Sequence, residues 1–217
     1  MEIISSKDNK KIKEARKLLT KKYRKNSYLI EGFHLLEEAL KAGRSIKQIF
    51  VEENKLTKLT EMIGSEKSLT DLSVNLVSKE VLKSLADSES PQGLIAEVTK
   101  IEEVIDYSAA KFLLLENVQD PGNVGTMIRT ADAAGFSAVI LLGETADIYS
   151  PKVMRSMQGS NFHLPLVRMA KEDCFAQLKK AGISILTTTL SANSVSYKII
   201  NEPHFALSMG NEGAAVS

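Results

Sequence analysis

A short polar segment carries the side chains best suited to bind a ligand. It runs from Glu116 to Asn123 with the sequence ENVQDPGN, and it supplies two carboxylates, three amides, a proline and a glycine. Arg129 follows two turns later and adds a guanidinium, which binds anions through several N–H donors. These groups could together hold a polar, partly anionic ligand.

The flanking segments predict where these groups lie. Phe112–Leu115 is a continuous apolar run, as expected for a parallel strand covered on both faces. From residue 124 apolar side chains recur at helical spacing, at Val124, Met127, Ile128, Ala131 and Ala134. The polar segment therefore lies at the carboxyl end of a buried strand, where open α/β sheets bind ligands.

An ordinary strand-loop-helix unit is the alternative interpretation of this stretch. The glycines match neither G-x-G-x-x-G nor G-x-x-x-x-G-K-[ST], so no dinucleotide or phosphate-loop fingerprint is present. Such a unit does not explain why Asn117, Asp120, Asn123 and Arg129 gather in one loop and helix start. The polar residues favour a binding or catalytic site.

The stretch resembles the first signature of the SpoU (TrmH) family of S-adenosylmethionine-dependent RNA ribose 2′-O-methyltransferases, D-P-x-N-x-G-x-x-x-R-T-A-x-x-x-G. A second signature, a strand ending in G-x-E-G, resembles Gly210-Asn211-Glu212-Gly213. Two shorter segments, Glu31–Ala39 and Ser90–Gly93, resemble parts of the family's amino-terminal substrate-binding domain. The matches to the first signature are Asp120, Pro121, Asn123, Gly125, Arg129, Thr130, Ala131 and Gly135.

The resemblance implies methyl transfer from S-adenosyl-L-methionine to a ribose 2′-hydroxyl, with Asn123, Arg129 and Glu212 as catalytic residues. Arg129 takes the position sometimes described as a general base. Because a guanidinium keeps its proton in proteins, we expect Arg129 instead to hold a phosphate and to stabilise negative charge on the 2′-oxygen. Asn123 would fix the loop or the ribose, and Glu212 would orient one of the other two. A helix N-terminal acid is the alternative interpretation of Glu212.

The resemblance also implies where the cofactor lies. Thr187, Thr188, Leu190 and Gly210 match family positions at which adenosine lies against the backbone. Gly210 suits this place because only a residue without Cβ permits a close approach. The family's third signature would follow Ser217, so we interpret Gly213–Ser217 as an interrupted chain, and we expect weak cofactor binding if the polypeptide is truncated there.

The expected fold is α/β, a parallel sheet with helices on both faces, preceded by a small α/β RNA-binding domain. Periodicity alone suggests an unknotted sheet. The resemblance implies instead a carboxyl-terminal trefoil knot where the cofactor and a dimer partner meet, and this knot would be incomplete in this chain if the polypeptide is truncated at Ser217. We expect an amino-terminal domain at 1–98, a linker at 99–110 and a methyltransferase domain at 111–217.

Composition narrows the class of protein. The chain has 217 residues, of which 43% are hydrophobic and 25% charged, as in soluble globular proteins. No apolar run approaches the roughly 20 residues of a membrane helix, and the start lacks a signal peptide's apolar stretch, so we expect a cytoplasmic protein without membrane partners.

Cys174 has no second cysteine to pair with, and we expect its thiol to be a small side chain packed in the core. The three histidines lack ligand spacing, and we predict no metal site.

Positive charge concentrates at the amino terminus. Residues 1–25 carry a net charge of +7, although the whole chain carries only +1. A solvated helix face is the ordinary interpretation of such a run. Because the chain also carries the two signatures, we favour the interpretation that these residues contact RNA phosphates. The predicted contact residues are Lys10, Lys11, Lys13, Arg16, Lys21, Lys22 and Arg24.

The favoured function is therefore methylation of structured RNA, with 23S ribosomal RNA as the first choice of substrate and a homodimer as the working form. A transfer RNA substrate is one alternative. A catalytically silent RNA-binding module is another. A nicotinamide dehydrogenase is disfavoured because the glycine fingerprint is missing.

Overall fold

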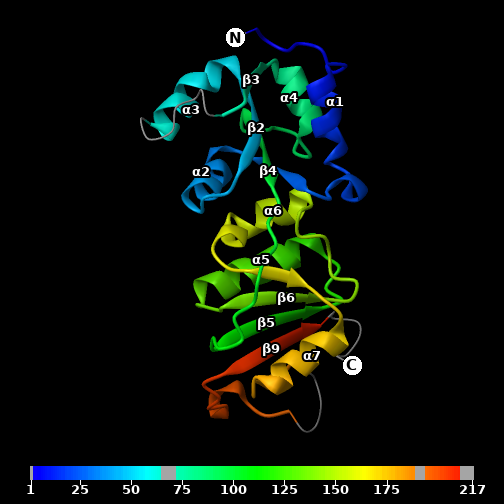
Figure 1. The fold of residues 1–217 in the computed structure, drawn as a ribbon, viewed down its shortest axis with the longest axis vertical. Helices are drawn as coiled ribbons and strands as arrows, with labels where there is room; N and C mark the ends of the chain where they lie inside the picture. Colours follow the sequence, from blue (N-terminus) through cyan, green and yellow to red (C-terminus); the bar gives the residue numbers. More distant parts are fainter. Residues whose placement is uncertain (1, 65–71, 189–193, 211–217) are drawn as a thin grey trace. The chain divides into compact units, whose positions relative to one another are not determined.

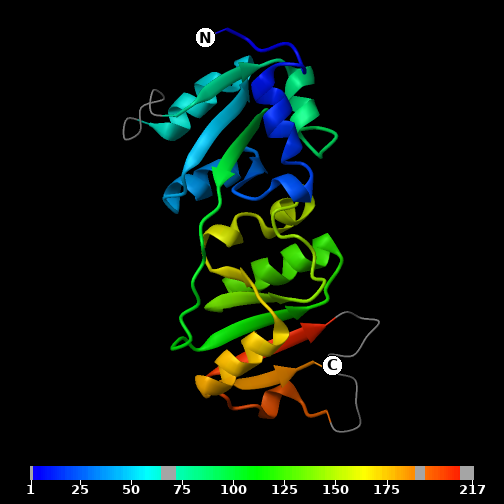
Figure 2. The same ribbon diagram turned by 45° about the vertical axis from the view of Figure 1, so that its right-hand side comes forward.

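The computed structural model describes residues 2–64, 72–188 and 194–210. The chain divides into two compact units. One comprises Met1–Ile101 together with Tyr149–Gly159, and the other comprises Glu102–Ile148 and Ser160–Ser217. Each unit is built around its own β-sheet (Figures 1 and 2).

The first unit has a four-stranded sheet of order β1-β4-β2-β3. The central strand β4 runs antiparallel to both β1 and β2, while β3 runs parallel to β2. Ile4 joins this sheet at its edge through an isolated parallel bridge with Val77, in which the N–H of Ile4 donates to the carbonyl of Leu76 at 2.9 Å. The strands are β1 (Ser27–Glu31), β2 (Ile46–Glu52), β3 (Val74–Val77) and β4 (Leu94–Thr99).

The helices of this unit follow from capping and apolar spacing. The Asn9 side chain caps the first helix by accepting from the N–H of Lys11, and the Ser78 hydroxyl caps the fourth by accepting from the N–H of Val81. The helices are α1 (Lys10–Lys17), α2 (Phe33–Lys41), α3 (Leu56–Ile63), α4 (Lys79–Leu85) and α6 (Pro151–Met157), with short 3-10 turns η1 (Lys21–Tyr23) and η2 (Glu53–Lys55).

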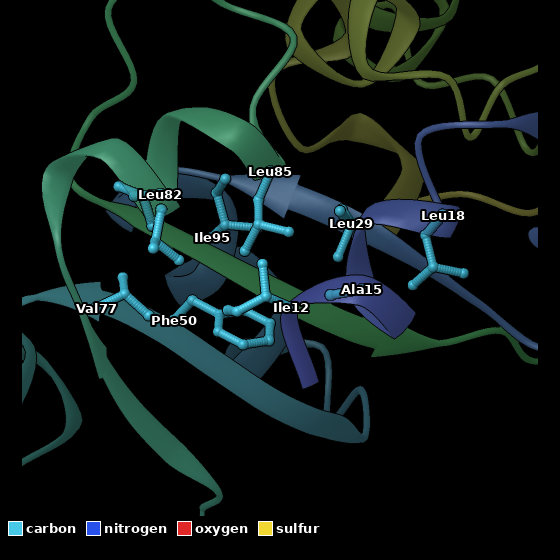
Figure 3. Packing of buried hydrophobic residues seen from close by; sticks show 10 residues of the cluster. Ile12, Ala15, Leu18, Leu29, Phe50, Val77, Leu82, Leu85 and Ile95 are labelled. Atoms are coloured by element: carbon cyan, nitrogen blue, oxygen red, sulfur yellow. The ribbon is translucent and has the colours of Figure 1, made fainter. Parts of the chain in front are cut away.

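The helices α1 and α4 share one core with the sheet. Ile12 and Ala15 of α1 are fully buried, and they meet apolar side chains from α4 and the strands (Figure 3). The basic residues of α1 therefore lie on the outer side of a packed helix. The cluster comprises Ile12, Ala15, Leu18, Leu29, Phe50, Val77, Val81, Leu82, Leu85 and Ile95.

The second unit has a five-stranded sheet of order β7-β6-β5-β9-β8, in which all neighbouring strands are parallel. The helices α5 (Pro121–Ala133) and α7 (Lys171–Lys180) lie on opposite faces of this sheet (Figures 1 and 2). Cys174 and Leu178 of α7 pack into the core beneath β5 and β6. The strands are β5 (Lys111–Glu116), β6 (Ala138–Leu142), β7 (Leu166–Arg168), β8 (Ser184–Thr187) and β9 (Phe205–Gly210), with 3-10 turns η4 (Ser160–Phe162) and η5 (Tyr197–Ile199).

The predicted α/β class, with a parallel sheet and helices on both faces, is confirmed. The compact units are not continuous in sequence, because Tyr149–Gly159 is grouped with the first unit. The centroids of the Tyr149 and Tyr28 rings lie 4.7 Å apart, and the Lys100 ammonium lies 3.9 Å from the centroid of the Tyr149 ring. The knot is predicted at the carboxyl end of the chain, where residues 211–217 lie outside the described residues.

Candidate active site at the carboxyl edge of the parallel sheet

The strand order predicts a ligand site at the end of β5. The chain leaves β5 through α5 and returns beside it in β6, whereas β9 and β8 fill the other side of β5. In open α/β sheets, ligands bind at the carboxyl edge where the connections diverge in this way. The last residue of β5, Glu116, pairs in register with Leu142 of β6 and Gly210 of β9.

Some polar residues of the predicted site build the loop itself. Asn117 adopts a positive φ of 56°, and its side-chain oxygen accepts from the N–H of Glu144 at 2.9 Å. A Cβ at Gly143 would lie 2.3 Å from that oxygen, so the contact requires glycine there. Asp120 caps α5 by accepting from the N–H of Asn123 at 2.7 Å, and Pro121 opens the helix. Asn117 and Asp120 thus shape the site rather than face a ligand.

Asn123 and Arg129 remain available on α5. Both side chains are exposed. Within the described ranges, neither side chain makes a hydrogen bond or an ion pair. Buried Val124, Ile128 and Ala131 fix the opposite side of the helix, so α5 presents an amide and a guanidinium from a rigid element.

A buried ion pair fixes the end of β5. The carboxylate of Glu116, only 5% exposed, accepts from the Lys171 ammonium at 2.8 Å. Lys171 is the first residue of α7, so the pair joins the sheet edge to the helix on the other face. Glu116 was part of the polar segment but was not predicted to be catalytic, and its contact indicates a framework role.

The predicted cofactor residues follow the two strands on the other side of β5. Thr187 ends β8, and the N–H and hydroxyl of Thr188 both donate to the Ser208 carbonyl of β9, at 3.1 and 3.2 Å. Gly210 ends β9 next to Glu116. Leu190 and the predicted catalytic Glu212 lie outside the described residues.

A buried polar atom at this edge is open to a further partner. The Ser208 side chain is fully buried, and its hydroxyl finds no hydrogen-bond partner among the residues whose positions are described. A buried hydroxyl without a partner costs roughly 1–3 kcal/mol. Together with the threonine hydroxyls and the Gly210 backbone, this donor and acceptor set fits a nucleoside, which needs hydrogen bonds and a close approach to the backbone.

Most of the predicted RNA contacts are exposed on the first unit. Lys10, Lys21 and Lys22 are exposed, and Arg16 is half-buried. Exposed Lys11 donates to Asn75 at 2.7 Å, and exposed Lys13 pairs with Asp8 at 2.9 Å.

Arg24 differs from the other predicted contacts. Its side chain is 6% exposed, and its Nη1 donates to the Leu18 carbonyl at 2.8 Å. Leu18 caps the carboxyl end of α1, where free carbonyls attract positive charge. Arg24 is therefore a structural residue, and the predicted RNA contact at this position is corrected.

Tyr23 is a surface residue that sequence reasoning missed. It is 44% exposed, and the Lys22 ammonium lies 4.8 Å from its ring centroid. An exposed aromatic side chain among cations suits stacking on a nucleobase. The available signal was its position inside the run Lys21–Lys25.

No described helix is long and apolar enough to cross a membrane. Among the same residues, no group of three or more His, Cys, Asp or Glu side chains is arranged to hold a metal ion.

Family models match both parts of the chain. The SpoU rRNA Methylase family matches residues 110–217, and the MRM3-like substrate binding domain matches residues 9–96. The two matches are consecutive in the sequence, with a short unmatched segment between them.

The chain is also similar to curated proteins and to solved structures. The chain is 41% identical over 218 residues to the 23S rRNA (guanosine(2553)-2′-O)-methyltransferase RlmP of Bacillus subtilis, covering 100% of this chain and 85% of that protein. It is 33% identical over 147 residues to the human mitochondrial rRNA methyltransferase 3, covering 64% of this chain and 34% of that protein. An AdoMet-bound rRNA methyltransferase from Sinorhizobium meliloti matches with a TM-score of 0.85 and 31% identity, covering 100% of this chain and 83% of that one.

Proposed function

The chain belongs to the SpoU rRNA methylase family, and on that premise we propose that it transfers the methyl group of S-adenosyl-L-methionine to a ribose 2′-hydroxyl of 23S ribosomal RNA. The observation that carries this proposal is the likeness to the Bacillus subtilis 23S rRNA methyltransferase, which spans the whole chain. The exposed guanidinium and amide of α5, the helix that follows β5, agree with it.

S-adenosyl-L-methionine supplies an electrophilic methyl group on a sulfonium. We propose that Thr187, Thr188, Leu190 and Gly210 hold its adenosine. The backbone of Gly210 permits a close approach, and the Ser208 hydroxyl can satisfy its missing hydrogen bond there. Proximity and alignment account for a large share of catalysis in such a transfer.

The RNA reactant is the 2′-oxygen, which gains the methyl group and releases its proton to water. Arg129 contributes positive charge where negative charge develops on that oxygen, or binds the neighbouring phosphate. Because a guanidinium stays protonated, it does this without acting as the base. We propose that Asn123 orients the ribose and that Glu212 orients Arg129 or Asn123.

The first unit is proposed as the RNA-holding part. Lys10, Lys11, Lys13, Arg16, Lys21 and Lys22 would contact phosphates, and Tyr23 would stack on an unpaired base. We also propose domain bounds of 1–98 and 111–217 around a linker at 99–110, a carboxyl-terminal trefoil knot, a homodimer through the methyltransferase domain, and a cytoplasmic location.

The test is transfer of tritiated methyl groups from S-adenosyl-L-methionine to unmodified ribosomal RNA. We expect label in an alkali-resistant dinucleotide. Arg129→Ala should lower the rate by about 100-fold or more, as the loss of a group that stabilises developing charge does. Lys179→Ala, at an exposed cation on α7, is the matched control and should retain the rate.

Other substrates are tested in the same assay. Label in transfer RNA alone would replace the ribosomal substrate with a transfer RNA. Well-folded protein that labels neither RNA would contradict the proposed activity and favour an RNA-binding module.

A further inference from the structure

Asp132 and His163 form a short contact beside Arg129. The Nδ1 atom of His163 lies 2.7 Å from an Asp132 carboxylate oxygen. Asp132 belongs to α5, and His163 directly follows η4. A carboxylate only accepts hydrogen bonds, so the proton of this contact lies on His163 Nδ1.

Asp132 is also well placed to pair with Arg129. These two residues are the only charged residues of α5, whose sequence is PGNVGTMIRTADA. They are three positions apart, and side chains at that spacing are neighbours on a helix surface. An arginine and an aspartate so placed usually attract each other.

The structure shows Asp132 paired with His163 instead. Its carboxylate is turned to the imidazole, while Arg129 makes no ion pair within the described parts of the chain. Arg129 therefore keeps its N–H donors for a ligand.

We propose that His163 is a positioning residue that holds the Asp132 carboxylate away from Arg129. This inference rests on the proposed function, in which Arg129 binds the phosphate or the 2′-oxygen. Without His163, Asp132 pairs with Arg129 and withdraws the guanidinium from the RNA. The ion pair also cancels the positive charge that attracts the RNA backbone.

The experiment compares single and double variants in the methyl-transfer assay. We expect His163→Ala to lower kcat/KM about three- to fivefold, the population shift that an exposed helix pair can produce. His163→Gln should stay near the wild-type rate, because its amide can still donate to Asp132. Asp132→Asn should match or exceed the wild type, and adding it to His163→Ala should restore the lost rate.

A merely structural role predicts a different pattern. If the pair only anchors α5, Asp132→Asn lowers the rate and the melting temperature as His163→Ala does, and the double variant is no better than either single one. That pattern would overturn the inference. Asp173→Asn, at an exposed acid on α7, controls for the loss of one negative charge.

A second readout does not depend on catalysis. Hydrogen exchange of the Arg129 Nε–H with solvent, followed by NMR and assigned with Arg129→Lys, should slow in His163→Ala and return to the wild-type rate in His163→Ala/Asp132→Asn. Unchanged exchange in His163→Ala would overturn the inference. If the wild type methylates no RNA, the proposed function fails, whereas the exchange rates still decide the position of Asp132.

Discussion

We expect a substitution of Arg24 to lower protein stability, and substitutions of its neighbours Lys21 and Lys22 to weaken RNA binding. Arg24→Ala removes a buried guanidinium whose Nη1 donates to the Leu18 carbonyl at 2.8 Å. A hydrogen bond from a charged group contributes about 1.5–3 kcal/mol, and the variant also leaves a carbonyl at the end of α1 without this donor. We expect the free energy of unfolding to fall by about 2 kcal/mol.

Lys21 and Lys22 should behave in the opposite way. Both are exposed, so replacing them with alanine should change stability by less than about 0.5 kcal/mol. Each phosphate contact contributes about 0.7–0.9 to the slope of log affinity against log salt. Lys21→Ala/Lys22→Ala should therefore flatten that slope by roughly 1.4–1.8.

Two measurements decide between these roles. Urea unfolding gives the stability, and filter binding of a ribosomal RNA fragment over a range of KCl concentrations gives the slope. Arg24→Ala should move the urea midpoint and keep the salt slope once the protein is folded. If Arg24→Ala instead flattened the slope by about one and left the urea midpoint unchanged, our assignment of Arg24 would be refuted.

Two ionisable groups of the structure give further predictions. Burial would raise the pKa of Glu97, but hydrogen bonds from Ser27, Gln48 and Lys47 outweigh this effect and hold the pKa below its usual 4.5. The ionised Glu97 carboxylate therefore stabilises the fold above pH 4.5, and this stabilisation is lost as the pH falls through the folded pKa. In urea unfolding, Glu97→Gln should lower the free energy of unfolding at pH 7 and make it depend less on acidification. Burial raises the pKa of Cys174 to about 11 from its usual 9. The free energy of unfolding should therefore fall as the pH rises above 9, and the thiol is protonated at pH 8. Ellman's reagent should react slowly with the native protein at pH 8 until urea unfolds the chain, and a prompt reaction in native buffer would contradict the burial.

Local sequence determined many of the elements. The apolar run Ala138–Leu142 predicts a buried strand and forms β6, and the sequence of Leu56–Ile63 predicts a helix and forms α3. A continuous apolar run marks a strand buried on both faces, and apolar spacing marks a helix that packs on one side.

Helix starts were harder to place from apolar spacing. The sequence predicts a helix at Phe175–Lys180, but α7 begins at Lys171, because its first turn is polar and contributes no apolar residue to the pattern. Likewise α5 begins at Pro121 rather than Val124, since the Asp120 cap starts the helix before the first buried residue. Acidic residues in the first turn and a capping aspartate are the signals that periodicity ignores.

Burial of a charged side chain could not be predicted from the basic run. Arg24 looks like its neighbours in the sequence, and only the approach of η1 to the end of α1 gives it a carbonyl to bind. The grouping of Tyr149–Gly159 with the first unit is equally non-local, since it depends on aromatic contacts between residues far apart in the chain.

Used and unused hydrogen-bonding capacity separates the framework of the site from the residues that can act on a ligand. Asn117, Asp120 and Glu116 are as polar as Asn123 and Arg129, yet their side chains bind Glu144, the start of α5 and Lys171. A group that already binds a neighbour must give up that contact before it can bind a ligand, which costs most for Glu116, whose pair with Lys171 is partly buried. Asn123 and Arg129 carry no such cost, because their side chains have no hydrogen-bond partner in the described part of the chain. Residue type and spacing predict that these five residues lie at the end of β5, in the loop after it and on α5, and their contacts separate the three that build the framework from the two that can bind a ligand.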